Sequence, residues 1–204
     1  MLDHVLLGCN DLERGIDLVF RHLGLRAAFG GIHPGRGTQN ALLSLGERRY
    51  LEIIAPDPKQ QRVIGHDQIV KLTEPRLVGW AAHVTNIDRL ASRLRTAGVA
   101  FQDPQPRSRR RPDGHVMSWK SLTLRNDHSG QLPFFIEWGA DGLHPSTDAP
   151  RGCSLVRFGA LAPDPEELTR LSALLGLDLP IEKGARPQLR ATLAGPGGEF
   201  SITS

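Results

Sequence analysis

The chain is organised around one stretch, Arg49-Tyr50-Leu51-Glu52-Ile53-Ile54-Ala55-Pro56. Its β-branched, aromatic and apolar residues, closed by Pro56, predict a buried strand. Glu52 sits at the centre of this strand. An ionised carboxylate buried there is costly unless a positive group meets it. The strand therefore raises the question of what neutralises Glu52.

A second stretch repeats the pattern, Pro133-Phe134-Phe135-Ile136-Glu137-Trp138. Side chains alternate along a strand, so Glu137 shares a face with Phe135, as Glu52 does with Tyr50. Two interpretations are open for these carboxylates. Either each is exposed at a sheet edge, or both point into one cavity and share a cation.

The strands around these two stretches predict a repeated unit of strand, helix and three further strands, an α+β arrangement of tandem βαβββ modules. The first module covers residues 1–55 and the second covers residues 79–139, with a linker at 56–78. A degenerate third copy follows Cys153, where Asp164-Pro165-Glu166-Glu167 has the pattern of a helix start. We expect one domain at residues 1–150, with residues 151–204 as a third module packed on it.

Several short motifs resemble the glyoxalase-like domain family of the vicinal oxygen chelate superfamily. They are Leu2-Asp3-His4-Val5, His33-Pro34-Gly35-Arg36-Gly37-Thr38, Tyr50-Leu51-Glu52, Gly79-Trp80-Ala81, Arg111-Pro112-Asp113-Gly114 and Pro133-Phe134-Phe135-Ile136. The resemblance covers roughly residues 1–145 and implies that two modules form a cupped mixed sheet. It is nearly silent on the reaction, because one such fold hosts many chemistries.

The resemblance also implies a metal site with ligands from the first and last strands of each module. Carried over, it makes His4, Glu52 and Glu137 the ligands of a divalent ion, Zn, Ni, Mn or Fe. The fourth position departs from the pattern, because its counterpart is Trp80. His83, three residues further on, is an alternative ligand.

Further polar residues are expected around the cup. Arg36 lies in a Gly-rich loop and suits an anionic or carbonyl substrate, although turn chemistry alone also explains the loop. Either Gln39 or Asn40 must face the cup, and His144 can serve as an acid, a base or a spare ligand. The arginines of the run Arg107–Arg111 are expected to be solvated.

These residues predict a metal-dependent enzyme of the glyoxalase or dioxygenase type, acting on a small carbonyl or diol substrate. Glu137 is the expected general base, and lyase, isomerase and dioxygenase chemistry are all open. The alternative is a metal-free protein of the same fold that sequesters a small molecule. Trp80 at the expected ligand position favours that alternative.

Composition limits the other classes. The 204 residues are 39% hydrophobic and carry a net charge of +3, as in an ordinary globular protein. The arginine run lacks interleaved aromatic residues, so we expect no nucleic-acid partner, and short apolar runs predict no membrane partner. Two cysteines without metal-type spacing favour a cytoplasmic location. The sequence is compatible with a homodimer.

Overall fold

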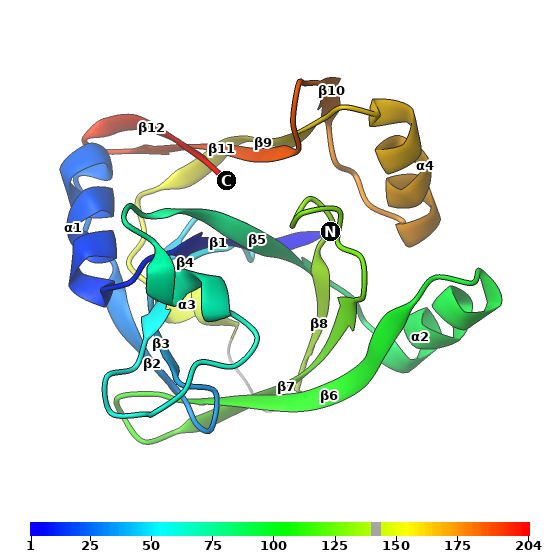
Figure 1. Ribbon diagram of the computed structural model, residues 1–204. Helices are drawn as coiled ribbons and strands as arrows, with labels where there is room; N and C mark the ends of the chain where they lie inside the picture. Colours follow the sequence, from blue (N-terminus) through cyan, green and yellow to red (C-terminus); the bar gives the residue numbers. More distant parts are fainter. Residues whose placement is uncertain (140–143) are drawn as a thin grey trace.

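The protein is described by a computed structural model of residues 1–139 and 144–204, in which eight strands close into a barrel (Figure 1). The strands are β1 (Leu2–Gly8), β2 (Ala28–His33), β3 (Thr38–Ser44), β4 (Tyr50–Pro56), β5 (Arg76–His83), β6 (Phe101–Arg110), β7 (Val116–Leu124) and β8 (Phe134–Trp138). Their order around the barrel is β1-β4-β3-β2-β6-β7-β8-β5. The predicted tandem modules and their curled sheet are therefore confirmed.

Each module contributes half of the barrel and pairs its first strand with its last. In the first module β1 lies parallel to β4, and in the second β5 lies parallel to β8. The modules meet along an antiparallel β1–β5 pair and, on the opposite side, at β2 and β6. The second seam is thin, since its one backbone pair joins Ile32 to Arg110.

Two helices cover the outside of the barrel, α1 (Leu12–Leu23) and α2 (Ile87–Thr96). Asp11 caps α1 by accepting a hydrogen bond from the backbone N–H of Arg14, and Gly24 ends the helix with a φ of 71°. The buried stripe of α1 packs on the outward residues of β4, including Leu51 and Ile53. The outer face of β4 is therefore covered by α1.

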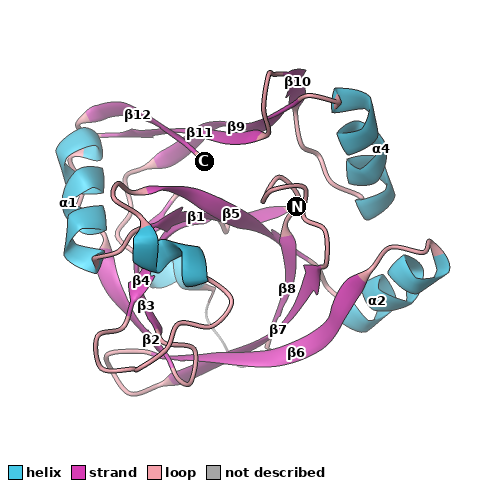
Figure 2. Ribbon diagram, viewed as in Figure 1, coloured by secondary structure: helices cyan, strands magenta, loops and turns pink. Residues whose placement is uncertain are grey.

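The third module has the predicted order of elements but a different sheet. Its elements are β9 (Ser154–Ala162), α4 (Pro165–Leu175), β10 (Ile181–Lys183), β11 (Gln188–Gly195) and β12 (Gly198–Thr203). The strand order is β10-β9-β11-β12, so the first strand pairs with the second and third rather than with the fourth. Figure 2 shows this sheet lying across the outside of β1 and β5, with α1 at one end and α4 at the other.

One segment differs from its sequence prediction. The arginine run Arg107–Arg111 was expected to be solvated, but residues 104–110 continue β6. Pro104 and Pro106 are tolerated because this part of β6 pairs with β7 on one side only. The linker between the modules holds a short 3₁₀ helix, η1 (Asp67–Lys71), and Ile69 packs against Leu6 and Ile54 inside the barrel. The linker thus closes part of the barrel mouth.

The thin seam between the modules gives a test of the fold. Gly31 has a φ of 137°, and a Cβ there would lie 2.0 Å from the carbonyl oxygen of Arg110. Gly31→Ala should therefore lower the free energy of unfolding by about 3 kcal/mol, since backbone strain and steric overlap add. Urea denaturation measures this loss.

Gly46→Ala is the matched control. Gly46 also has a positive φ, 74°, but its Cβ would meet nothing within 4 Å. We expect a loss of about 1 kcal/mol from the backbone alone. Equal losses in the two variants would show that the close approach at the seam does not constrain the barrel.

Candidate functional site

The barrel encloses a cavity of about 410 Å³ that opens at the linker side. Its floor and walls come from both modules. From the first come His4, His33, Asn40, Tyr50 and Glu52, and from the second come Arg107, Arg109, Trp119, Phe134 and Trp138. A cavity of this volume, with polar groups gathered on one side, has the size of a small-molecule site.

Glu52 lies inside this cavity and is nearly buried, with 7% of its surface exposed. Its Oε1 accepts a hydrogen bond of 2.6 Å from the side-chain amide of Asn40, and its Oε2 lies 3.3 Å from His4 Nε2. Burial pushes the pKa of Glu52 upward, but hydrogen bonds and the charge of His4 outweigh it and lower that pKa below its usual range. Glu52 is therefore ionised at neutral pH.

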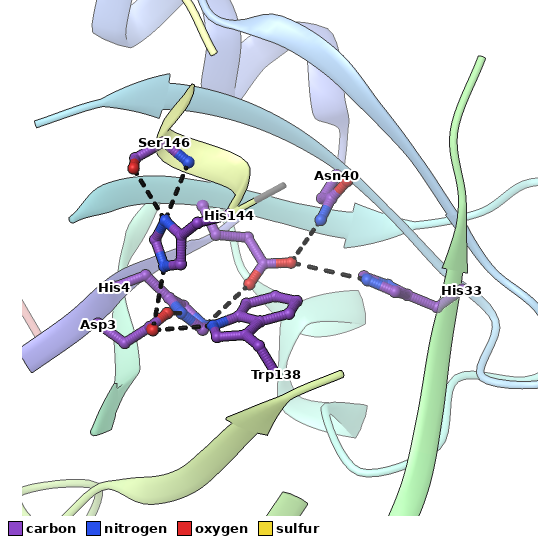
Figure 3. A network of polar contacts seen from close by, with 8 residues as sticks. Asp3, His4, His33, Asn40, Trp138, His144 and Ser146 are labelled. Carbon is purple, nitrogen blue, oxygen red and sulfur yellow. Dashed lines mark hydrogen bonds and ion pairs between the residues drawn. The ribbon is translucent and has the colours of Figure 1, made fainter. Parts of the chain in front are cut away.

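His4 is the positive group that meets Glu52. Its Nδ1 lies 2.7 Å from Asp3 Oδ1, so the ring is held between two carboxylates (Figure 3). Burial opposes the charge of the ring, but hydrogen bonds to Asp3 and Glu52 raise the pKa of His4 to about 9. At neutral pH His4 is an imidazolium, and both ring nitrogens donate.

Asp3 is fixed in turn by two residues that lie 135 and 141 positions away in the sequence. Its Oδ2 accepts a hydrogen bond of 2.9 Å from the indole of Trp138 and lies 3.2 Å from His144 Nε2. His144 Nδ1 contacts the hydroxyl of Ser146, as Figure 3 shows. These contacts, with burial opposing them, lower the pKa of Asp3. His144 therefore supports the ion pair from behind rather than lining the cavity.

His33 has the opposite charge state to His4. Its Nε2 lies 3.8 Å from Glu52 Oε1, and its Nδ1 contacts the Thr38 hydroxyl at 2.9 Å. Burial, aided by the charge of Arg109, lowers the pKa of His33 to about 4, although Glu52 opposes the shift. A neutral imidazole and an imidazolium thus flank one carboxylate.

The structure places Glu137 on the outside of the barrel, so the predicted convergence of Glu52 and Glu137 is wrong. Glu137 Oε2 accepts a hydrogen bond of 3.2 Å from the backbone N–H of Ile87, the first residue of α2. The inward residues of β8 are Phe134, Ile136 and Trp138. Glu137 therefore caps a helix, and its predicted role as metal ligand and general base has no support from its position.

Trp80 explains why the second module lacks a counterpart of His4. Its ring packs against Phe158 of β9 at 5.2 Å between centroids, and its indole donates to the carbonyl of Gln131. The side chain at the expected ligand position, Trp80, thus packs against the C-terminal sheet instead. His83, the alternative ligand, does not line the cavity, and its backbone N–H donates to Met1.

The remaining predicted substrate residues divide between the two faces. Asn40 faces the cavity and holds Glu52, whereas Gln39 donates to the carbonyl of Pro56 outside it. Arg36 lines the cavity. Arg109 was expected to be solvated, but it is buried and lines the cavity, because β6 continues through it and turns it inward.

The arrangement of donors does not fit the divalent-metal centre that the sequence predicts. His4 and Glu52 lie on neighbouring strands and face the same side, but Glu137 faces away. His4 is directed at Glu52 itself and is engaged by Asp3 on its other nitrogen. Within residues 1–139 and 144–204, no group of three or more His, Cys, Asp or Glu side chains is placed to hold a metal ion. The charge of His4 takes the place that the metal was expected to fill.

The profile of the family described as "Glyoxalase-like domain" matches residues 2–175. The chain belongs to the glyoxalase-like domain family. The match extends past the barrel into α4, which is further than the sequence motifs reach. A search of curated protein sequences gives no match. None of the helices described is both long and apolar enough to cross a membrane.

Solved structures support the fold. A hypothetical protein from Staphylococcus aureus is 17% identical, with a TM-score of 0.68 over 98% of this chain and 84% of that one. Methylmalonyl-CoA epimerase from Mycobacterium tuberculosis is 24% identical, with a TM-score of 0.50 over 68% of this chain and 87% of that one. Identities this low establish the fold alone.

The two histidines beside Glu52 predict a stability maximum near pH 6.5. The folded-state pKa of His4 is raised, so its contribution is complete below about pH 6.5 and is lost as the pH rises towards 9. The folded-state pKa of His33 is lowered, so stability is lost as the pH falls from about 6.5 towards 4. Each limb should be worth up to about 3 kcal/mol. Urea denaturation across this range measures both.

His33→Gln should shrink the acid limb and leave the alkaline limb unchanged. Part of the acid limb should remain, because burial also lowers the pKa of His66. His115→Gln, at an exposed position, is the control and should preserve both limbs. If the free energy of unfolding of the wild type does not fall between about pH 6.5 and 9, the positive charge assigned to His4 is wrong.

Proposed function

We propose that the barrel interior is the reaction site of a glyoxalase-type enzyme that moves a proton on a small carbonyl or diol compound. The observation that carries this proposal is the ionised Glu52 carboxylate, buried in a cavity of small-molecule size and held by His4 and Asn40. Strongly shifted pKa values in a cleft are typical of functional groups. The partner is therefore a small molecule.

Glu52 is the proton acceptor of the proposed reaction. A carbon next to a carbonyl group releases its proton to a Glu52 oxygen, and the electron pair of the broken C–H bond moves onto the carbonyl oxygen as an enolate. His4 keeps its own proton and positive charge, so it then faces the enolate in place of the Glu52 carboxylate. Return of the proton from Glu52 to the same carbon completes a proton exchange without an oxidant. In an α-hydroxy carbonyl compound the proton can instead return to the former carbonyl carbon, while the hydroxyl proton passes to the enolate oxygen and the first carbon becomes the new carbonyl.

No step of this mechanism uses a divalent metal, because the described donors do not fit one. The metal that the family resemblance implies is tested by elemental analysis of protein purified without a His tag. Stoichiometric metal lost together with activity in Glu52→Gln would restore the metal-dependent enzyme that the sequence predicts.

The lowered pKa of Glu52 favours a second function, a metal-free binding protein. A carboxylate with a low pKa is a weak base, yet it is a strong hydrogen-bond acceptor. In this case Glu52 accepts a hydrogen bond from a ligand hydroxyl, and no bond to carbon is broken. The two functions share one site and differ in whether a carbon-bound proton exchanges.

Proton exchange in deuterated water separates the two functions. The wild type should speed up the loss of the C–H signals of dihydroxyacetone, acetoin or pyruvate in proton NMR spectra. Glu52→Gln should reduce that rate by about 100-fold or more, because a general base contributes 10² to 10⁴-fold.

Glu137→Gln is the matched control, since its carboxylate lies outside the barrel. It should keep the exchange rate within about threefold, at a cost in stability of about 1 kcal/mol from the lost helix cap. Exchange that survives Glu52→Gln, or that is lost equally in Glu137→Gln, would contradict the proposal. Binding of these compounds without exchange would favour the second function.

A further inference from the structure

Arg109 is a buried cation that faces the cavity, and it has no carboxylate partner among the residues that the structure describes. Only 5% of its surface is exposed, and it lines the cavity beside Tyr50. Among residues 1–139 and 144–204, no carboxylate oxygen lies within 4.0 Å of its nitrogens. Its Nη2 contacts the sulfur of Met117 at 3.0 Å, and its Nε is buried with no hydrogen-bond partner among those residues.

This situation differs from that of the neighbouring arginine. Arg111 pairs with Asp148 and Asp113 at the surface. A thioether is a weak acceptor, so most of the five N–H donors of Arg109 lack a strong acceptor. Burying a charge without strong hydrogen-bond acceptors lowers the stability of the fold. Proteins retain such a charge at sites where a bound ligand supplies the acceptors.

We infer that Arg109 is the anion-binding residue of the cavity and that its ligand is a small monocarboxylate with a second oxygen group that faces Glu52. The planar guanidinium fork matches a carboxylate, which can accept two parallel hydrogen bonds. This inference rests on the proposed function for the place of the ligand, and it adds the substrate class.

The charges of the cavity favour a monoanion. Asp3, His4 and Glu52 together carry one net negative charge, and the cavity-lining Asp127 adds a second, whereas Arg36, Arg107 and Arg109 are positive, so about one positive charge is left over. A doubly charged phosphate at Arg109 would be repelled more strongly by Glu52 than a carboxylate would. A hydroxyl or enolisable carbon at the other end of the ligand would instead meet the Glu52 carboxylate.

Binding of matched carboxylates and neutral compounds tests the inference. The probes are pyruvate against butane-2,3-dione and lactate against propane-1,2-diol, followed through the indole N–H signals of Trp119 and Trp138, which line the cavity. The wild type should bind at least one carboxylate about tenfold or more tightly than its neutral counterpart. Arg109→Met should abolish this preference, and Arg109→Lys should weaken it about tenfold. Arg110→Met, at the exposed neighbouring position, should keep it within about twofold.

The stability of the ligand-free protein gives a second readout. Arg109→Met should raise the melting temperature, because it removes a buried charge that has no partner. Added carboxylate should raise the melting temperature of the wild type but not that of the variant.

Several results would overturn the inference. The wild-type protein must bind at least one of the carboxylates, and it must bind it more tightly than the neutral probe and than inorganic phosphate; either failure rules the inference out. The same holds if Arg110→Met loses as much binding, or if Arg109→Met lowers the melting temperature. All are binding or stability measurements, so failure of the proton-exchange assay leaves them readable. If the carboxylate preference is absent while proton exchange is intact, the inference about Arg109 fails and the proposed function stands.

Discussion

The imidazolium of His4, held between the carboxylates of Asp3 and Glu52, is the interaction on which the rest of the site depends. An ionised Glu52 inside a barrel needs a positive neighbour, and the parallel pairing of β1 and β4 brings His4 against it. Asp3 keeps His4 charged, and Trp138 and His144 keep Asp3 in place. The polar wall of the cavity is thus one connected network. Removing one of its charged side chains leaves a buried neighbour without the partner that compensates its charge.

The C-terminal sheet limits which side chains of the second module can face the cavity. It lies on the outside of β1 and β5, and Trp80 turns outward to pack against Phe158. The inward face of β8 is apolar apart from the indole of Trp138, so the second module contributes aromatic walls and the arginines of β6. An arrangement that is symmetric in its backbone therefore encloses a cavity that is asymmetric in charge.

Much of this architecture could be predicted from the sequence, because helix caps, turn residues and the repeated element order are local signals. The family resemblance also placed His4 and Glu52 in one site, and their side chains do face the same side of the sheet. Alternation failed for Glu137 because both faces of β8 are buried, with Phe134 inside the barrel and Phe135 in the outer core. With apolar residues on both faces, the sequence does not say which face is the interior.

Arg109 was missed for a different reason. A run of arginines flanked by prolines resembles a solvated loop, and only the pairing of β6 with β7 reveals that Arg109 points inward. Asp3 was missed because its role is to orient His4, which cannot be recognised until Trp138 and His144, more than a hundred residues away, are brought beside it. Local patterns locate strands, whereas charge networks depend on the closure of the barrel.

The central claim is that His4, as an imidazolium, neutralises Glu52. The most direct measurement is the protonation state of the His4 ring, followed by nitrogen-15 NMR between pH 5 and 10 on protein treated with a chelator and on untreated protein. We expect His4 to be protonated at neutral pH in both samples and to titrate with a pKa of about 9. A neutral His4 ring at pH 7 in either sample would contradict the central claim.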